Sequence, residues 1–305
     1  MAVPQGRRAI SAGAFATLLL IALMMGANHV AARIAFNNGL SVATAVVARS
    51  FVTAAVVGVL LLVARVPLLT TARHKRFLLV IGLLIGVQSL CLYSAVARLP
   101  VALALLAFNT YPLWTALWDR LLYQRRPERA TLQAMPPILL GLALALDVSG
   151  AASGLGAAGQ WARIGAGVAF ALAAAATFGL ALVLTQRETS GLDGRLRTVS
   201  TMVLAGLVAL TVGMAGVPGG MHLPTATAGW WGLGALTLLY GTAFTVMFTV
   251  LPKLGVAGNS AIMNVEPVFA LVLAWLILGQ TIAPIQVAGA LLVVGAVMVL
   301  GLRKK

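Results

Sequence analysis

The sequence contains very little charge for its length, and acidic residues are the scarcest of all. Only 9% of its 305 residues are charged, and just six are aspartate or glutamate. Soluble domains carry about 25% charged residues, so the chain lacks the polar surface that a water-soluble fold needs. No two acids occupy adjacent turns of one apolar segment, which disfavours the convergent acid and base groups of a membrane enzyme.

Metal-binding residues are equally rare. The single cysteine, Cys91, lies inside an apolar run, which excludes an internal disulfide and a cysteine-based metal site. The three histidines, His29, His74 and His222, are far apart and have no metal-ligand spacing such as HExxH. We therefore expect no metal and no cofactor.

Apolar residues, in contrast, make up 61% of the chain and raise its mean hydropathy to +1.03. They occur in long runs, and about 20 such residues cross a membrane as one helix. Breaks at proline, glycine and charged residues divide the chain into ten of these runs. The sequence thus predicts an all-α integral membrane protein whose ten transmembrane helices lie near 13–34, 41–64, 77–97, 101–123, 131–148, 163–185, 197–216, 228–251, 257–279 and 282–302.

The positive charge is distributed unevenly between the loops of the two sides. The formal net charge is +15, and most of the 21 basic residues fall on the side that carries both termini. Only Arg33, Arg98 and Arg163 fall on the opposite side. Basic loops stay in the cytoplasm, so we expect both termini there. The same bias accounts for the charge without nucleic acid as a partner, and it leaves membrane lipid as the expected neighbour.

An internal repeat relates the two halves of the chain. Residues 75–125 align with 230–280 without a gap, at a constant offset of 155. Helices of similar composition match by chance, but Asn109 and Pro112 also match Asn264 and Pro267, and polar residues and proline are scarce in these runs. Five helices per half is an odd number, so the second half must be inverted in the membrane, an arrangement typical of secondary transporters. The expected units are a first five-helix repeat at 1–148, an external linker at 149–162 and an inverted five-helix repeat at 163–305.

Several stretches resemble the ten-helix EamA branch of the drug/metabolite transporter superfamily. They are Gly26-Ala-Asn-His-Val-Ala-Ala-Arg33, Ala48-Arg49, the segment from Asn264 to Ala270, Leu278-Gly-Gln280 and Pro284-Ile-Gln-Val-Ala-Gly289. Met25 stands where the family commonly has tryptophan, and Gln124 or Arg125 and Gln280 stand where acidic residues often end the fourth and ninth helices. The resemblance implies transport of a small metabolite, with the bacterial inner membrane as the expected location.

Two charged residues lie deep within the predicted helices. A charge at mid-bilayer costs about 2.5–3.5 kcal/mol on insertion scales, so such residues face the interior of the bundle. Glu266 is a candidate proton or substrate-amine site, and Arg49 is its counter-charge or a clamp for a substrate carboxylate. The alternative is a purely structural ion pair between the two.

Proline and asparagine mark the fourth and ninth helices. Pro112 and Pro267 each free a carbonyl group and predict a kink, which either hinges a central cavity or merely bends a packed helix. Asn28, Asn109 and Asn264 either join helices by hydrogen bonds or contact the substrate.

Aromatic and amide side chains complete the candidate binding site. An amphipathic pocket combines aromatic walls with a few polar groups. The residues that suit it are Gln88, Tyr93, Tyr111, Trp114, Tyr240, Phe244 and Trp275, although aromatic residues also fill helix interfaces. Trp161, Trp230 and Trp231 suit the membrane interface instead, and Asp119 and Arg120 suit a local ion pair.

The sequence predicts a secondary transporter, specifically an exporter of a small amphipathic or zwitterionic metabolite such as an amino acid. Alternating access around a midplane cavity is the expected mechanism, and proton coupling through Glu266 is open. A carrier of sugar nucleotides or other anionic metabolites is the alternative within the same superfamily. Small residues of the fifth and tenth helices, including Gly141, Ala145 and Gly289, pair either the two halves or two protomers. Monomer and homodimer therefore both remain open.

Overall fold

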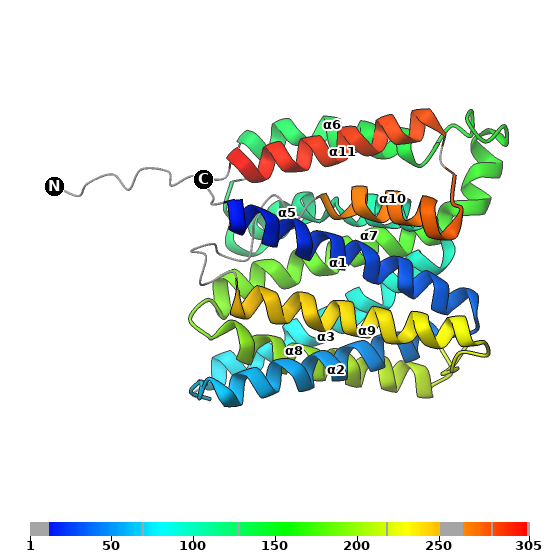
Figure 1. Cartoon of the computed structure of the whole chain (residues 1–305). Coiled ribbons are helices and arrows are strands. Elements are labelled where there is room, and N and C mark those ends of the chain that lie inside the picture. Colours follow the sequence, from blue (N-terminus) through cyan, green and yellow to red (C-terminus); the bar gives the residue numbers. More distant parts are fainter. Residues whose placement is uncertain are drawn as a thin grey trace.

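The computed structural model of the chain is a bundle of α-helices that run lengthwise and connect at two ends (Figure 1). It describes residues 12–303 except 69, 127–128, 218, 251–264 and 282, and these residues contain no β-strand. Their helices are, in order, α1 (Ala12–Asn37), α2 (Val42–Val63), α3 (Ala72–Arg98), α4 (Val101–Phe108), α5 (Tyr111–Tyr123), α6 (Arg129–Ala145), α7 (Gly156–Glu188), α8 (Gly194–Met214), α9 (Thr227–Thr249), α10 (Glu266–Leu278) and α11 (Pro284–Arg303).

The lengths and surfaces of these helices are those of an integral membrane protein. Within the described residues, six segments are long and apolar enough to cross a membrane, namely α1, α2, α3, α4 with α5, α7 and α8. Shorter apolar helices occur in α6, α10 and α11. Large apolar side chains such as Val63, Leu62 and Trp231 are 70–78% exposed on the outside of the bundle, as a lipid solvent allows. The total of ten crossings stays a prediction.

The start of α7 differs from the sequence-based expectation. The glycine- and alanine-rich stretch that suggested a flexible loop up to residue 163 becomes helical at Gly156. Gln160 is almost completely buried, and its amide nitrogen donates to the carbonyl oxygen of Leu146 at 2.8 Å. Arg163 donates to the side-chain oxygen of the same residue at 2.9 Å. These contacts, together with the high helix propensity of alanine, extend α7 into the predicted loop.

The fourth predicted helix is interrupted rather than kinked. It forms α4 and α5, with a turn at Asn109 and Thr110, and Pro112 lies in the first turn of α5. Pro112 has no amide hydrogen for the carbonyl oxygen of Phe108, so this helical bond is missing. The side chains of Asn109 and Thr110 donate to the carbonyl oxygens of Leu105 and Ala107 at the turn. Every residue of α4 from Val101 to Ala107 is buried, which places this short helix in the centre of the core.

The start of α10 corresponds to the start of α5 at the offset of 155 residues. Helix α5 runs from Tyr111 to Tyr123, and α10 runs over the corresponding residues Glu266 to Leu278. Both have proline in the first turn. Both also end on a left-handed residue, Gln124 with φ 54° and Gly279 with φ 62°. The internal repeat is therefore visible in the positions at which helices begin and end.

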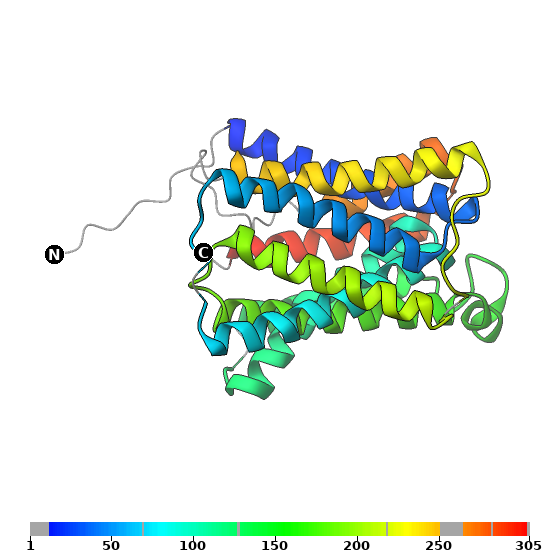
Figure 2. The ribbon, with the colours of Figure 1, turned by 90° about the horizontal axis from the view of Figure 1, so that it is seen from below.

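Helix packing shows the same twofold relation. Helix α1 packs on α9 and α10, and its counterpart α7 packs on α3 and α5; α2 packs on its own counterpart α8, and α6 packs on α11. Corresponding helices run in opposite directions, as α1 and α7 do in Figure 1 and α2 and α8 do in Figure 2. The two-repeat architecture is thus an inverted one, and α1 begins at the end of the bundle where α11 ends.

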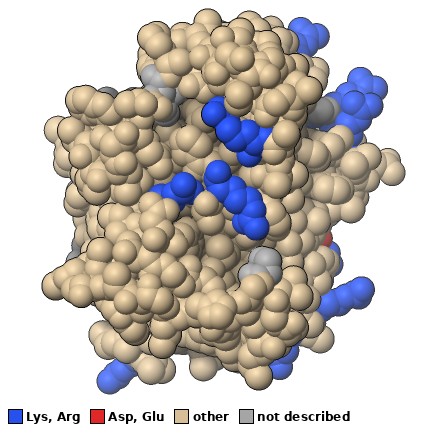
Figure 3. All heavy atoms as spheres, turned by 90° about the vertical axis from the view of Figure 1, so that its right-hand side faces the viewer, with Lys and Arg blue, Asp and Glu red and all other residues tan. Residues whose placement is uncertain are grey.

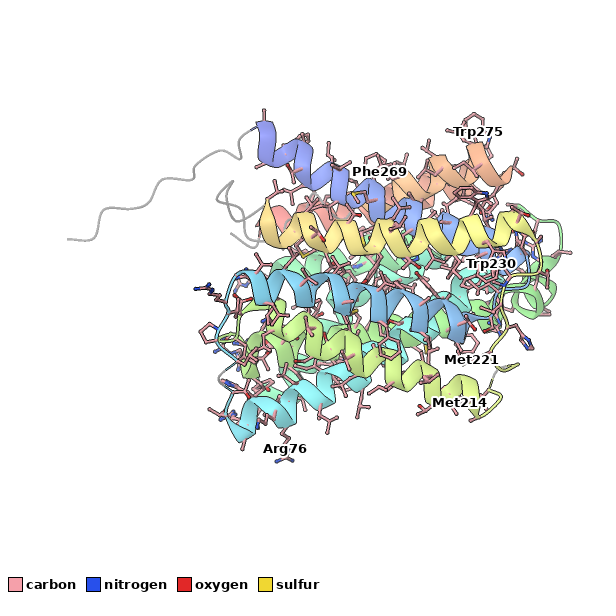
Figure 4. The ribbon with its side chains drawn as sticks, turned by 60° about the horizontal axis from the view of Figure 1, so that its bottom comes forward. Arg76, Met214, Met221, Trp230, Phe269 and Trp275 are labelled. Atoms are coloured by element: carbon pink, nitrogen blue, oxygen red, sulfur yellow. The ribbon has the colours of Figure 1, made fainter. Side chains whose placement is uncertain are left out.

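Glycines set the closest approaches between the halves. A Cβ atom built on Gly26 of α1 would lie 3.3 Å from the Cβ of Phe269 and 3.1 Å from the amide nitrogen of Ala270 in α10. A Cβ atom on Gly179 of α7 would meet the Cβ of Trp114 and the amide nitrogen of Thr115, both at 2.9 Å, and these are the residues 155 positions earlier. Figure 4 shows Phe269 beside α1.

The small residues of α6 and α11 join the two halves within one chain. A Cβ atom on Gly141 would lie 2.7 Å from the carbonyl oxygen of Gly289, and one on Gly289 would lie 2.5 Å from the amide nitrogen of Ala145. The sequence allowed these small residues to pair either the two halves or two protomers, and in the structure they pair the two halves.

Candidate functional site

A cluster of buried polar side chains lies between α1, α2, α3 and α9, within an otherwise apolar bundle. Arg49 of α2 is only 3% exposed, and its Nη2 donates to the hydroxyl of Ser89 in α3 at 2.7 Å. Ser89 donates in turn to the side-chain oxygen of Gln88 at 3.3 Å. A chain of hydrogen bonds therefore leads from the cation to the amide of Gln88.

The guanidinium of Arg49 contacts the rings of two tyrosines. Its central carbon lies 4.6 Å from the ring centre of Tyr93 in α3 and 4.2 Å from that of Tyr240 in α9. A desolvated cation gains about 2 kcal/mol or more from an aromatic face, which offsets part of the cost of burying the charge. Tyr93 also donates its hydroxyl hydrogen to the side-chain oxygen of Asn28 in α1 at 3.1 Å. Asn28 thus joins two helices, one of the two roles that the sequence left open.

Glu266 has a partner that the sequence did not indicate. Its Oε1 lies 3.3 Å from Nε2 of His29 in α1, and the side chain of His29 is only 3% exposed, against 24% for Glu266. The ring of His29 also contacts that of Tyr93 edge-on, with centroids 5.8 Å apart. His29 therefore connects the carboxylate of α10 to the cluster around Arg49.

The backbone explains why His29 and Glu266 meet. Gly26 allows α1 to lie directly against the first turn of α10, where a Cβ atom would come within 3.1 Å of the carbonyl oxygen of Glu266. Pro267 lies in the first turn of α10, where its missing amide hydrogen leaves no helical hydrogen bond unmade. Glu266 therefore occupies the amino end of a helix inside the bundle, where the helix dipole favours a negative charge.

The expected pairing of Arg49 with Glu266 is wrong, because each residue has other partners. Arg49 contacts Ser89 and the two tyrosine rings, whereas Glu266 contacts His29. Among the described residues, no carboxylate lies within ion-pair distance of Arg49. The two charges nevertheless belong to one region, because Tyr93 contacts both the guanidinium of Arg49 and the ring of His29, the partner of Glu266.

Several donors and acceptors of this region have no partner among the described residues. They include Nδ2 of Asn28, Nδ1 of His29, Nε of Arg49 and the hydroxyls of Ser50 and Thr53, all buried atoms. Buried polar groups in native proteins are nearly always hydrogen-bonded, and the usual exceptions are sites that bind water, ions or ligands. We define Asn28, His29, Arg49, Ser89, Tyr93, Tyr240 and Glu266 as the polar cluster.

The remaining predicted site residues lie in different surroundings. Phe244 extends the cluster by packing on Tyr240, with ring centroids 4.9 Å apart. Tyr111 belongs to an aromatic group with Phe108 and Phe178, near enough to Glu266 to be affected by its charge. Trp114 packs at Gly179, in the interface between α5 and α7.

The structure changes the roles predicted from the sequence for Asn109, Trp275 and Asp119. Asn109 donates its side-chain amide to the carbonyl oxygen of Leu105 in its own helix rather than to a neighbouring helix, and its contact with substrate stays a prediction. Trp275 does not line a pocket, because it is 59% exposed and points away from the bundle in Figure 4. Asp119 pairs with Arg187 of α7 at 2.8 Å, not with its neighbour Arg120, since a helix directs adjacent side chains apart. Asn264 lies outside the described residues, so its role stays a prediction.

His29 and Ser89 are the cluster residues that sequence reasoning missed. His29 was considered only as a metal ligand, although any ionisable residue inside a membrane helix is a functional candidate. That rule, applied to the segment Gly26-Ala-Asn-His-Val, indicates His29 from the sequence alone. Ser89 gives no comparable signal, because a single serine in an apolar helix is common and its contact with Arg49 depends on how α2 and α3 pack.

The end of the bundle opposite the start of α1 carries its own basic group. Figure 3 shows Lys and Arg side chains gathered near the centre of this end, with no acidic side chain among them. Arg33, in the last turns of α1, is half-buried and donates to the carbonyl oxygens of Val96 and Leu99 at 2.7 and 3.3 Å. It thereby caps the end of α3. Nearby, the side-chain oxygen of Gln280 accepts from the amide of Val101 at 3.1 Å and ties α10 to the turn between α3 and α4.

Comparison with known proteins identifies related sequences and folds. The model of the EamA-like transporter family matches residues 12–146 and again residues 165–302, which together make up most of the chain. A comparison with curated proteins finds no match. A protein known from its crystal structure is 20% identical and has a TM-score of 0.60, with 97% of this chain and 99% of that chain covered. At that identity the solved structure supports the fold alone.

Proposed function

Because the chain belongs to the EamA-like transporter family, we propose that it exports a small amphipathic or zwitterionic metabolite, such as an amino acid, by alternating access. The family itself is one of membrane transporters with small-molecule substrates rather than enzymes. The single observation that supports the finer proposal is the polar cluster, which is buried and incompletely hydrogen-bonded where helices of both halves meet. Inverted repeats that exchange conformations would open such a site to one side at a time.

Proton coupling through Glu266 is part of this proposal. The carboxylate is partly accessible and contacts the buried His29, so one added proton would change the charge at the contact between α1 and α10. A carboxylate inside a membrane protein is a common proton relay. A proton placed on the carboxylate of Glu266 would remove its negative charge. This would weaken the attraction between α1 and α10 and favour the other conformation.

The composition of the cluster argues against the alternative cargo. A sugar nucleotide carries several negative charges, and phosphates are normally bound by several cations or helix ends. The described cluster contains one permanently charged cation, Arg49, and one histidine. A substrate with a single negative charge, balanced or not by an amine, suits it better.

The proposal includes the location of the protein. The positive-inside bias places the end of the bundle that carries the start of α1 and the end of α11 in the cytoplasm of a bacterial cell. The end shown in Figure 3, with Arg33, would then face outward.

Flux measurements in proteoliposomes test the function. Amino acids, organic cations and sugars are offered to the wild-type protein and to Glu266→Gln and His29→Gln, with and without an imposed pH gradient. We expect wild-type accumulation of an amino acid to follow the gradient. Both variants should lose this gradient-driven part by about tenfold or more and retain exchange between the two sides.

Glu188→Gln serves as the matched control, because this glutamate pairs with Arg73 and Tyr123 at one end of the bundle. It should keep the response to the gradient. Full gradient-driven flux in Glu266→Gln would show that the proton site lies elsewhere and that the carboxylate is structural.

A further inference from the structure

Arg49 is a buried cation whose charge is not balanced by an acid of the described chain. Each described acid has other partners. These are Arg187 for Asp119, Arg73 for Glu188, Arg195 for Asp193, the backbone amides of Ala152 and Ser153 for Asp147, and His29 for Glu266. The sixth acid, Glu128, lies outside the described residues. Burying a charge without a counter-charge is costly, so a bound anion would be strongly favoured at this position.

The surroundings of the guanidinium leave only part of it available. The central carbon of the guanidinium lies 4.6 and 4.2 Å from the ring centres of Tyr93 and Tyr240, so both rings crowd it. Nη2 is used by Ser89. The Nε–H has no partner among the described residues and points within the guanidinium plane. The Nε–H is therefore a free donor at which an anion can bind, in the plane of the guanidinium.

A second unused donor belongs to the same arrangement. Asn28 accepts the hydroxyl hydrogen of Tyr93 through its oxygen, which leaves its Nδ2 group without a partner in the described chain. Asn28 is fully buried. Tyr93 thus lies between two unpaired donors, one charged and one neutral, and both would otherwise remain unsatisfied in a low-dielectric interior.

We propose that the free edge of the Arg49 guanidinium binds the carboxylate of the transported molecule, and that Tyr93 and Tyr240 position the guanidinium for it. A carboxylate is planar, carries one charge and matches the in-plane fork of arginine, whereas lysine offers only a point charge. The rings keep the plane fixed, so the carboxylate does not have to order a mobile side chain on binding. This inference rests on the proposed function and specifies which group of the substrate the protein recognises.

The test compares substrates that differ only at the carboxylate. Leucine and phenylalanine are each measured beside their amides and their decarboxylated amines in proteoliposomes, and the flux ratio of acid to amide is the readout. We expect the wild-type ratio to be about ten or more, since a charge-assisted hydrogen bond to a carboxylate accounts for at least that factor. Arg49→Gln should bring the ratio close to one, and Arg49→Lys should give an intermediate value.

Arg163→Gln is the control, because this arginine is exposed at one end of the bundle and loses the same charge. The acid-to-amide flux ratio of this variant should equal that of the wild type. A wild type that moves amides as fast as acids, or an Arg49→Gln protein that keeps the preference for acids, overturns the carboxylate site while transport itself stands. Absence of flux for all six compounds contradicts the proposed amino-acid transport and the carboxylate site together. Because the ratio is measured within one protein preparation, a general loss of folded protein does not imitate a loss of preference.

Discussion

At the scale of single residues, Gly26 and Gly179 determine how closely the two halves approach. Each packs near the start of a helix that has proline in its first turn, and the residues that they contact, Trp114 and Thr115 in α5 and Phe269 and Ala270 in α10, correspond at the offset of 155. A side chain at Gly26 would push α10 away from α1 and lengthen the contact between His29 and Glu266. Packing at this residue is therefore coupled to the geometry of the polar cluster.

Replacement of Gly26 by alanine should impair transport while the protein still folds. The added methyl group would meet backbone atoms at 3.1 Å, which requires a shift of α10 by a few tenths of an ångström. We expect gradient-driven flux to fall several-fold and the free energy of unfolding to fall by about 1–3 kcal/mol, as for other overpacked sites. Thermal unfolding in detergent and proteoliposome flux measure the two effects.

Gly58→Ala is the matched control, because it lies within α2 and has no atom within 4 Å of a built Cβ. It should raise helix stability by up to about 1 kcal/mol and leave flux unchanged. Equal flux in both variants would contradict the link between the Gly26 contact and the polar cluster.

At the scale of helices, the beginnings and ends decide where polar groups can lie inside the bundle. The first turns of α5 and α10 lie inside the bundle, and α10 presents Glu266 there. Conventional caps fix other helices at the ends of the bundle, as with Ser41 for α2, Thr71 for α3 and Asp193 for α8.

The cap of α8 gives a prediction with a defined pH dependence. Asp193 accepts from the amide of Arg195 at 2.8 Å and from its guanidinium at 2.9 Å, and mainly this side-chain hydrogen bond lowers the pKa of the Asp193 carboxyl. Asp193→Ala should reduce stability by about 1 kcal/mol at neutral pH. Because the pKa of Asp193 is lower in the folded than in the unfolded protein, the stabilising contribution of its carboxylate is fully present above the unfolded-state pKa of about 3.9. This contribution is lost as the pH falls through the folded-state pKa.

The difference between wild type and Asp193→Ala should therefore shrink as the pH is lowered below about 4, measured by chemical unfolding in detergent. Asp193→Asn keeps a side-chain acceptor without the charge, so it should lose less stability than the alanine variant at neutral pH. A difference that grows on acidification would contradict the assignment of the cap.

At the scale of the whole molecule, the strongest helix contacts of one half correspond to contacts of the other, as those of α1 with α9 and α10 correspond to those of α7 with α3 and α5. The polar cluster departs from this symmetry, because Glu266 contacts His29 whereas the equivalent Tyr111 contacts Phe178. An asymmetric site between symmetric halves suits a substrate that is itself asymmetric in charge.

The arrangement of the bundle in the membrane is testable with reporter fusions. Fusions after residues 70, 127 and 190 should report the cytoplasm, and fusions after 155 and 221 should report the outside, because basic loops are retained inside. The structure places the start of α1 and the end of α11 at the same end of the bundle, which requires an even number of crossings. Opposite signals at two of the five sites would contradict the orientation and the count of ten together.

The sequence by itself determined the membrane class, the repeat and the family resemblance, because apolar runs, loop charges and a constant offset are properties of the linear chain. It also indicated that Arg49 and Glu266 face the interior of the bundle, since a charge in an apolar helix is costly at the lipid surface. Only the tertiary structure decided their partners. Which side chains meet across helices depends on the rotation and spacing of neighbouring helices, and at α1 and α10 that spacing follows from the absence of a side chain at Gly26. A periodic pattern indicates which face of a helix is buried, whereas the contact of His29 with Glu266 and the contacts of Arg49 with Tyr93 and Tyr240 depend on the packing of five helices.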